Sequence, residues 1–156
     1  MKIPSLLLPS LILVATLLGC EAVLAQEKTA PKKADLDAET KALIQKTEKG
    51  DATSQLQLGR LYAEGQGVAK DEVEAMKWYR KAADQGNAPA QVNLGLMYAN
   101  GQGVAKDEVE AYKWWLLAGA QGNEFAKENI PLIERDLTAA QRAEGQRLAR
   151  EWKSKK

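Results

Sequence analysis

The chain of 156 residues contains no histidine and a single cysteine, Cys20. Without histidine the most common general base is missing, and a Ser-His nucleophile is excluded. A lone cysteine forms no intramolecular disulfide, and histidine and cysteine are also the usual ligands of transition metals. The sequence therefore predicts no catalytic site, no metal site and no cofactor, and we expect that the protein is not an enzyme.

The chain also lacks an excess of charge of one sign. Its 22 Lys and Arg residues nearly balance 21 Asp and Glu residues, which gives a formal net charge of +1. Such a balance creates no strong field to attract nucleic acid. Leu and Ala are frequent while β-branched residues are sparse, which favours helices over strands. We expect one all-α domain that binds no nucleic acid and no small-molecule substrate.

The one long apolar run lies at the N-terminus, over residues 6–18, and follows Lys2. It is shorter than the roughly 20 residues that span a bilayer and is typical of a signal peptide. Cleavage after Ala25 would remove residues 1–25. The residues Leu17-Leu18-Gly19-Cys20 resemble instead the lipobox of bacterial lipoproteins, in which residues 1–19 are removed and Cys20 is lipidated.

Both alternatives predict export, to the periplasm or the medium in the first case and to an outer-membrane anchor in the second. The membrane is then a partner only if Cys20 carries lipid. Residues 26–34 are polar and contain one proline, so they predict a flexible linker between the leader and the domain.

Residues 52–87 align without a gap on residues 88–123, which gives an internal repeat of 36 residues. Within each unit, apolar residues recur at helical spacing on both sides of a glycine-rich break. Gly65 and Gly67 supply the backbone conformation in which a first helix ends, and Asp71 with Glu74 forms a capping-box variant at the start of a second. Each unit is therefore predicted to be a hairpin of two helices, A and B.

The flanking sequence continues the repeat in weaker form. Residues 35–49 predict a helix B of an incomplete preceding unit, and residues 124–152 predict a third helix A followed by a last helix. Pro131 stands where the second repeat has Gly95, so we expect the third helix A to be kinked or shortened. Leu137, Leu148 and Trp152 are expected to cover that end. Together residues 35–153 form a short right-handed α-solenoid of antiparallel hairpins, with two full repeats and flanking capping helices.

The motifs of the two repeats are LGxxY in helix A, GxGVxxD in the loop, and AxxWxxxAAxxGN in helix B, with Gly119 as the one departure. In these residues the chain resembles the Sel-one-like repeat (SLR) family, a relative of the tetratricopeptide repeats. The resemblance implies an adaptor or scaffold whose members bind proteins or peptides in signalling and envelope assembly, with exported and lipoprotein members in bacteria.

The aromatic residues recur with the repeat, which predicts packing rather than a stacking platform for a ligand. We expect the recurrent pairs Tyr62/Tyr98 and Trp78/Trp114 in the core, and Trp115 partly exposed. Gly59 and Gly95 are expected to make room where helices A and B cross. Four glutamates fall in the first turns of the B helices, where negative charge stabilises the helix dipole better than it would serve acid catalysis: Glu72, Glu74, Glu108 and Glu110.

One stripe of helix A differs between the otherwise similar repeats, through Thr53/Pro89, Gln57/Asn93, Arg60/Leu96 and Glu64/Asn100. Neutral drift on a solvated face explains this as well as selection for a partner does. Because helix A usually lines the concave face of a stacked solenoid, this stripe predicts a mixed polar groove for an extended peptide or partner loop. The predicted partner-binding residues are Gln57, Arg60, Asn93, Leu96, Asn100 and Asn129.

The function that follows is a protein–protein interaction or scaffold module of the bacterial cell envelope. Two alternatives stay open. A hydrolase acting on the cell wall is suggested only by the compartment and is opposed by the missing histidine. An inhibitor or immunity-type protein that blocks one enzyme is not separated from the first interpretation by the sequence.

Overall fold

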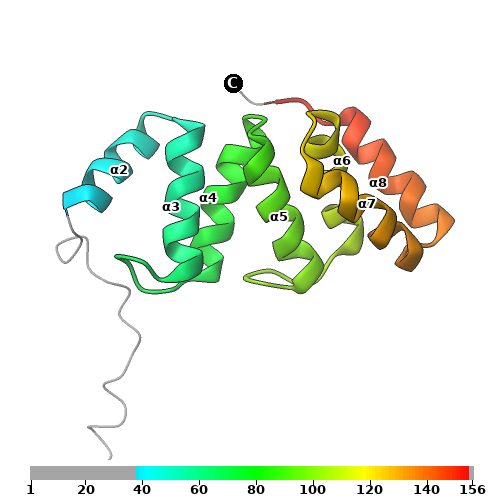
Figure 1. Ribbon diagram of the computed structural model, residues 1–156, viewed down its shortest axis with the longest axis horizontal. Coiled ribbons are helices and arrows are strands. Elements are labelled where there is room, and N and C mark those ends of the chain that lie inside the picture. The colour runs from blue at the N-terminus through cyan, green and yellow to red at the C-terminus, as the bar shows by residue number, and fades with distance from the viewer. Residues whose placement is uncertain (1–37, 155–156) are drawn as a thin grey trace, which may run out of the picture.

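The computed structural model describes residues 38–154. The predicted leader with Cys20, the linker and residues 35–37 of the predicted first helix lie outside the described residues. Between residues 38 and 154 the chain forms seven α-helices and no strand. In chain order they are α2 (Ala38–Glu48), α3 (Ala52–Glu64), α4 (Glu72–Asp84), α5 (Ala88–Asn100), α6 (Glu108–Ala120), α7 (Glu124–Asp136) and α8 (Ala139–Glu151) (Figure 1).

The helices succeed one another along the long axis of the molecule, from α2 at one end to α7 and α8 at the other (Figure 1). Each helix from α2 to α6 contacts the next, most extensively within the pairs α3–α4 and α5–α6. These pairs are helices A and B of the two repeats. The predicted all-α solenoid of helical hairpins is thus confirmed. None of the described helices is both long and apolar enough to cross a membrane.

Local capping sets the helix boundaries, as predicted. The Asp71 carboxylate accepts hydrogen bonds from the backbone N–H groups of Val73 and Glu74, at 2.9 and 3.0 Å, and Asp107 does the same one repeat later. These side chains satisfy N–H groups that have no partner inside the helix. The reciprocal half of the capping box predicted for Asp71 and Glu74 is not formed, because Glu74 pairs with Lys77 and the Asp71 N–H donates to the Tyr62 carbonyl. A complete capping box is formed at α8 by Thr138 and Gln141.

The helix A to helix B loops depend on glycine. Gly65 ends α3 with φ of 73° and Gly101 ends α5 with φ of 68°, a region that side chains other than glycine rarely adopt. The core between A and B helices is close-packed around alanines with no exposed surface. These are Ala75, Ala82, Ala111 and Ala118.

Two other glycines, Gly59 and Gly95, allow helices A and B to approach each other closely. A Cβ atom placed on Gly59 would lie 2.6 Å from Cδ1 of Tyr79, and one on Gly95 would overlap the Trp115 indole. The prediction that these glycines make room at the crossing is confirmed. Since a real Cβ does not approach so closely, an alanine at either position would push the two helices apart.

The C-terminal end differs from the prediction in one respect. α7 has 13 residues, as α3 and α5 have, so the expectation that Pro131 shortens this helix is wrong. Pro131 is exposed, whereas Gly95 at the equivalent position is buried against its own helix B. A proline inside a helix removes one hydrogen bond, yet α7 continues past Pro131 to Asp136.

The last helix packs beside α6, which it contacts more extensively than it does α7. A Cβ on Gly145 of α8 would lie 2.6 Å from Cδ1 of Tyr112, so the two helices cross closely there. Leu137 is buried, and Trp152 meets Trp114 edge to face with ring centroids 6.3 Å apart. The predicted cover of this end is present, with Leu148 half-buried.

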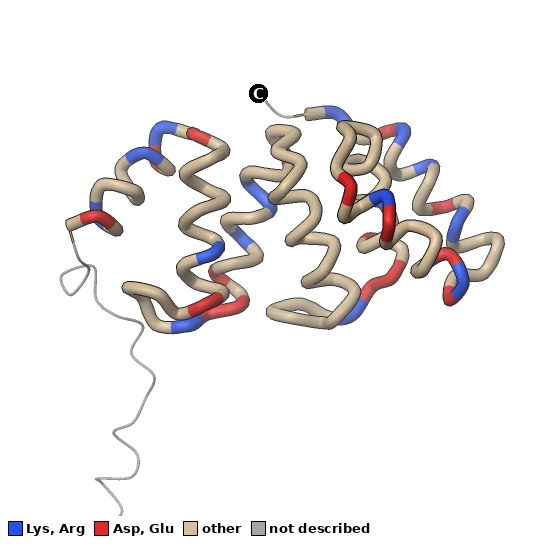
Figure 2. The backbone as a smooth tube through the Cα atoms, in the orientation of Figure 1, with Lys and Arg blue, Asp and Glu red and all other residues tan. Residues whose placement is uncertain are grey.

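Both ends of the described solenoid replace packing residues with polar ones. In α2, Glu39 and Lys46 stand where α4 has the fully buried Ala75 and Ala82. In α7, Lys127 stands exposed where α5 has the fully buried Gln91. Terminal units of a solenoid need such polar outer faces because no further unit covers them. Charged residues lie on all of the described helices except α5 in the middle, which carries none (Figure 2).

Candidate functional site

The six predicted partner-binding residues lie on the three A helices, α3, α5 and α7. Gln57 and Arg60 are exposed on α3, Asn93 and Leu96 are half-buried on α5, and Asn129 is half-buried on α7. Asn100 is exposed at the end of α5. The stripe is therefore accessible on every A helix.

A large groove, of about 660 Å³, lies between α2 and α3. Gln57, Arg60 and Leu61 of α3 form one wall with Glu64, and α2 forms the other. The α2 side is lined by Glu39, Thr40, Ala42, Leu43 and Lys46. A volume of several hundred cubic ångströms is typical of a ligand-sized cleft, and this one has both charged and apolar walls.

A second, smaller groove of about 160 Å³ contains Asn93 and Leu96. This small groove occupies the position of the large groove, one repeat later in the chain. Five lining residues of the large groove have counterparts exactly 36 positions on in the small one: Leu43/Tyr79, Gln57/Asn93, Arg60/Leu96, Leu61/Met97 and Gln66/Gln102. The small groove is also lined by Ala63, Lys70 and Glu72 of the first repeat. The inter-repeat groove is thus a recurring feature of the A-helix face.

Two of the predicted residues lie in neither groove. The Asn100 side chain donates to the Gln102 side chain at 3.4 Å, and Asn129 donates through Nδ2 to the Phe125 carbonyl at 2.7 Å. Beside Asn129, two large apolar side chains on α7 are open to solvent, Phe125 at 43% and Leu132 at 51%. These two are the counterparts of Pro89 and Leu96, so they extend the predicted stripe to α7. The prediction did not include them.

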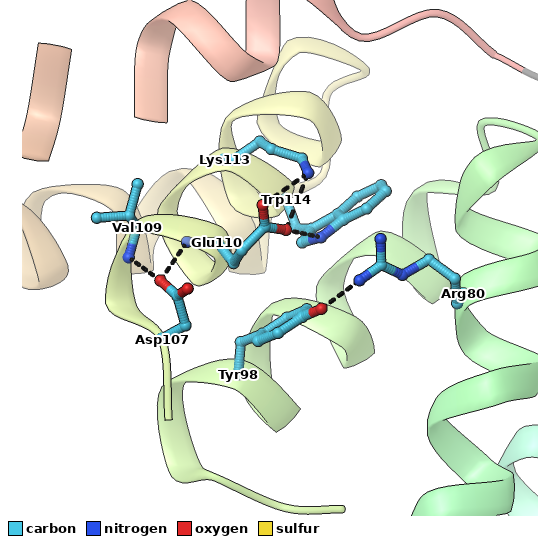
Figure 3. Close-up of polar contacts among 7 residues, drawn as sticks. All are labelled: Arg80, Tyr98, Asp107, Val109, Glu110, Lys113 and Trp114. Atoms are coloured by element: carbon cyan, nitrogen blue, oxygen red, sulfur yellow. Dashed lines mark hydrogen bonds and ion pairs between the residues drawn. The ribbon is translucent and has the colours of Figure 1, made fainter. Parts of the chain in front are cut away.

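A polar and aromatic cluster joins the two repeats behind this face (Figure 3). The Arg80 guanidinium of α4 donates to the Tyr98 hydroxyl and lies over the rings of Tyr98 and Trp114, 5.6 and 5.2 Å from their centroids. Glu110 accepts from Trp114 Nε1 at 3.1 Å and from Lys113 at 2.9 Å. Burial raises the pKa of the Tyr98 hydroxyl, although the nearby Arg80 charge opposes the shift. The cluster fixes the position of α5 relative to α4.

The aromatic predictions are partly confirmed. Trp114 and Tyr98 are buried, but Trp78 and Tyr62 are only half-buried. The prediction that Trp115 is partly exposed is wrong, because 5% of it is accessible and its Nε1 donates to the Val92 carbonyl at 3.3 Å. Its ring fills the space that Gly95 leaves. Tyr79, its counterpart, is buried against Gly59, and burial raises its pKa to about 12.

Buried glutamines of the A helices, Gln55 and Gln91, take part in a further repeated contact that the sequence reasoning did not identify. Gln85 Nε2 donates to Gln55 Oε1 at 2.8 Å, and 36 positions later Gln121 donates to Gln91 at the same distance. Gln91 is fully buried and also donates to the Ala83 carbonyl. Identical glutamines one repeat apart were the available signal, since a buried amide needs partners for its polar atoms.

The glutamates of the B-helix first turns are engaged in ion pairs with lysines. The four ion pairs are Glu72 with Lys70, Glu74 with Lys77, Glu108 with Lys106, and Glu110 with Lys113. In the part of the chain that the structure covers, no group of three or more His, Cys, Asp or Glu residues could hold a metal ion.

A chain of antiparallel helical hairpins stacked along one axis, with grooves that recur along the A-helix face, belongs to the class of helical-repeat scaffolds. The sequence model of the Sel1 repeat matches residues 52–87 and 88–123, the bounds of the internal repeat. The chain therefore contains two repeats of the Sel1 family. Proteins of this family are generally protein-interaction scaffolds.

Two solved structures are similar to the chain. One is c5321, a protective antigen present in uropathogenic Escherichia coli strains and displaying an SLR fold, with 38% identity over 72% of this chain and a TM-score of 0.71. The other is a Sel1 repeat protein from Oxalobacter formigenes, with 38% identity over 60% of this chain and a TM-score of 0.58. This chain spans 24% of the first protein and 38% of the second. The comparison with curated proteins gave no match.

Proposed function

We propose that this protein is an interaction module of the bacterial cell envelope, which binds a peptide or loop of a partner protein on the concave face of its A helices. The observation that carries the proposal is the recurring groove. Four of the six residues selected from sequence line it in its two copies, Gln57 and Arg60 in one and Asn93 and Leu96 in the other. A groove that repeats along a face suits a polymer such as a peptide chain.

The residues of the large groove favour a protein partner over a small molecule. Its lining mixes four charged side chains with the apolar Leu43 and Leu61, so a bound segment could form ion pairs and bury apolar surface at once. An enzyme blocked through this groove would be one case of the same function. The chain offers no histidine for catalysis.

Site-specific photo-crosslinking in cells tests the binding face. A photoreactive phenylalanine analogue is placed at Gln57 or Asn93 on the A-helix face, and in a control at Val73, which is 51% exposed on α4. We expect the same crosslinked protein from positions 57 and 93 and none from position 73. Crosslinks from position 73 alone, or none at either groove position, would contradict the proposal.

The envelope location rests on the leader, through cleavage after Ala25 or lipidation of Cys20. Cell fractionation combined with metabolic labelling by a lipid precursor tests it. Label that disappears with Cys20→Ser identifies a lipoprotein, and an unlabelled protein in the periplasmic fraction identifies ordinary cleavage. Recovery of unprocessed protein in the cytoplasm would exclude both.

A further inference from the structure

The two copies of the inter-repeat groove differ in the helices around them. The small groove, of about 160 Å³, is lined on one side by Ala63 of α3, which is the helix A that packs with α4. The large groove, of about 660 Å³, lies beside α2, and within residues 38–154 no helix A precedes α2. The large groove therefore lies where a complete repeat unit has its helix A.

The opposite end of the described chain has a helix A without its helix B (Figure 1). α7 follows α6 as α5 follows α4, but the next helix, α8, packs mainly on α6. The side of α7 that would meet a helix B is exposed at Lys127 and Pro131, whereas the equivalent Gln91 and Gly95 of α5 are buried. The two ends thus carry complementary halves of one repeat unit.

The residues at the crossing of helices A and B are matched in size between the two ends. In the first repeat Gly59 of α3 faces the Tyr79 ring of α4, and the second repeat has the same arrangement. The equivalent residues at the ends are Pro131 of α7 and Leu43 of α2. The larger helix A residue is thus combined with a smaller helix B residue, which conserves volume at the crossing.

The α2 wall of the large groove carries one charge of each sign. Glu39 lies about one turn before Leu43, and Lys46 lies about one turn after it. On the α3 wall, Arg60 and Glu64 lie one turn apart and offset each other. The groove therefore selects no single charge, but its α2 wall favours an occupant with two charges in a fixed order.

α7 carries two charges in that order. Glu128 lies about one turn before Pro131 and Arg135 one turn after it, and both are exposed. Neither forms an ion pair within residues 38–154. Helices A and B of one unit run antiparallel, so docking of α7 on α2 of another copy brings Arg135 toward its Glu39. The same docking brings Glu128 toward its Lys46.

We infer that α7 of one copy of this protein docks in the large groove of a second copy, where it completes a repeat unit with α2 and continues the solenoid. The interface joins two different surfaces, so it builds open chains or rings and not a closed two-fold dimer. The inference goes beyond the proposed partner and does not exclude it. Gln57 would line the groove that remains, as Asn93 lines the small groove beside α3.

Two contacts oppose this docking and keep it weak. Lys127 of α7 and Lys49 at the end of α2 take the positions of the hydrogen-bonded glutamine pair of the first repeat, so two like charges would meet. Asp51 lies near Lys46 and offsets part of its charge, although the Asp51 carboxylate also caps α3. Separate copies therefore stay soluble, and association depends on concentration.

Sedimentation equilibrium tests the inference with the protein purified as cells process it. At concentrations up to about 1 mM, where even a dissociation constant of that order is detected, we expect an average mass above that of two copies. Glu39→Arg and Arg135→Glu each place like charges together and should weaken association at least about tenfold. Arg150→Glu, which changes an exposed cation on α8, is the matched control and should have no effect.

A mixture of the two weakened variants gives the sharpest result. Each alone has like charges at its junction, but the altered end of either variant has the opposite charge to the end of the other. An equal mixture of Glu39→Arg and Arg135→Glu should therefore associate about as well as the parent protein. Lys127→Gln should strengthen association by about threefold, because it removes the like-charge contact with Lys49.

Cysteine crosslinking locates the junction. Leu43→Cys with Pro131→Cys in one chain should give a ladder of disulfide-linked copies on a non-reducing gel. Leu43→Cys with Val73→Cys, at a side chain that is 51% exposed on α4, is the control and should give none. Neither predicted processed form keeps another free thiol, because Cys20 is removed or lipidated.

The outcomes separate this inference from the proposed function. A monomer at every concentration overturns the inference, as does a mixture that associates no better than either variant alone. A closed dimer that both charge variants leave intact also overturns it. None of these results affects the crosslinks from Gln57 and Asn93 to a partner. If those crosslinks reach only another copy of this chain, the inference is supported and the proposed partner is not.

Discussion

The two repeats place the same residue types at the same positions but give them different surroundings. Trp114 of the second repeat is fully buried, donates its indole N–H to Glu110 and is covered by Trp152. Trp78 of the first repeat is only half-buried, and its indole nitrogen is buried without a hydrogen-bond partner. Since both follow the same local motif, the difference comes from the neighbours that each repeat has in the solenoid.

Arg80 on the first helix B shows how the surroundings of a residue depend on the neighbouring repeat. Arg80 at the middle of α4 faces forward into the second repeat, where it contacts Tyr98 and Trp114 (Figure 3). Its counterpart one repeat later is Leu116, and one repeat earlier it is Ile44. Only the junction between the two full repeats therefore has this charged contact. In a repeat protein, stability is the sum of each unit and its interfaces, so the two junctions should differ in strength.

The largest expected effect on stability comes from the two equivalent tryptophans, Trp114 and Trp78. Trp114→Ala should lower the free energy of unfolding by about 3–5 kcal/mol, because it empties a fully enclosed site. Trp78→Ala should lower it by about 2 kcal/mol, because much of that ring already contacts solvent. Urea unfolding followed by helical circular dichroism measures both.

Tyr112→Ala is a useful control, since Tyr112 is also fully buried and lies on the same helix as Trp114. It should resemble Trp114→Ala in cost. Equal losses for Trp78→Ala and Trp114→Ala would show that the local motif, and not the neighbouring unit, sets the contribution.

A smaller effect on stability is expected at the junction between the two full repeats. Arg80→Leu gives the first repeat the residue that the second has at this position, and removes the hydrogen bond to Tyr98 and the contact with the Trp114 ring. We expect a loss of about 1–2 kcal/mol in the free energy of unfolding. A double-mutant cycle with Tyr98→Phe isolates the hydrogen bond from the ring contact. Strict additivity of the two single variants would exclude the coupling between the repeats.

The sequence predicted correctly those features of the fold that depend on nearby residues or on one repeated contact. The capping role of Asp71, the helix end at Gly65 and the crossing at Gly59 each depend on a few residues close in the chain or on one repeated contact. Sequence reasoning failed for the exposure of Trp115, which depends on how α5 packs against α6. It also failed for the length of α7, because Pro131 was expected to kink or shorten this helix, and the helix continues to Asp136. The pattern within one repeat is the same whether or not a neighbour follows.

The candidate site shows the same division. The stripe of Gln57, Arg60, Asn93 and Leu96 could be predicted, since it follows from helical spacing and from differences between repeats. The size of each groove could not be predicted, because it depends on tertiary packing. The large groove depends on the position of α2, and the small groove on that of Ala63 in α3. Phe125 and Leu132 were missed because their exposure depends on tertiary packing: among the described helices, none packs over this side of α7.

The smallest effect concerns Tyr79 and Trp115, which occupy the same position against Gly59 and Gly95. Burial raises the pKa of Tyr79 to about 12, while an unfolded tyrosine ionises near 10. The folded state therefore holds the proton where the unfolded state loses it. The stability that the neutral phenol contributes is present below pH 10 and is lost as the pH rises from about 10 toward 12. Trp115 has no ionisable group, so the second repeat makes no such contribution at this position.

Tyr79→Phe removes the ionisable group and keeps the ring that packs on Gly59. We expect near-equal urea midpoints for the variant and the parent protein at pH 8. At pH 11 the variant should have the higher midpoint. Tyr62, Tyr98 and Tyr112 also have a raised pKa through burial, so the variant should still lose stability in alkali, but less steeply. Parallel pH profiles for the two proteins would mean that Tyr79 ionises in the folded state as readily as in the unfolded state. In that case the first repeat would open at Gly59 before the solenoid unfolds, and the two repeats would differ in local stability as well as in their contacts.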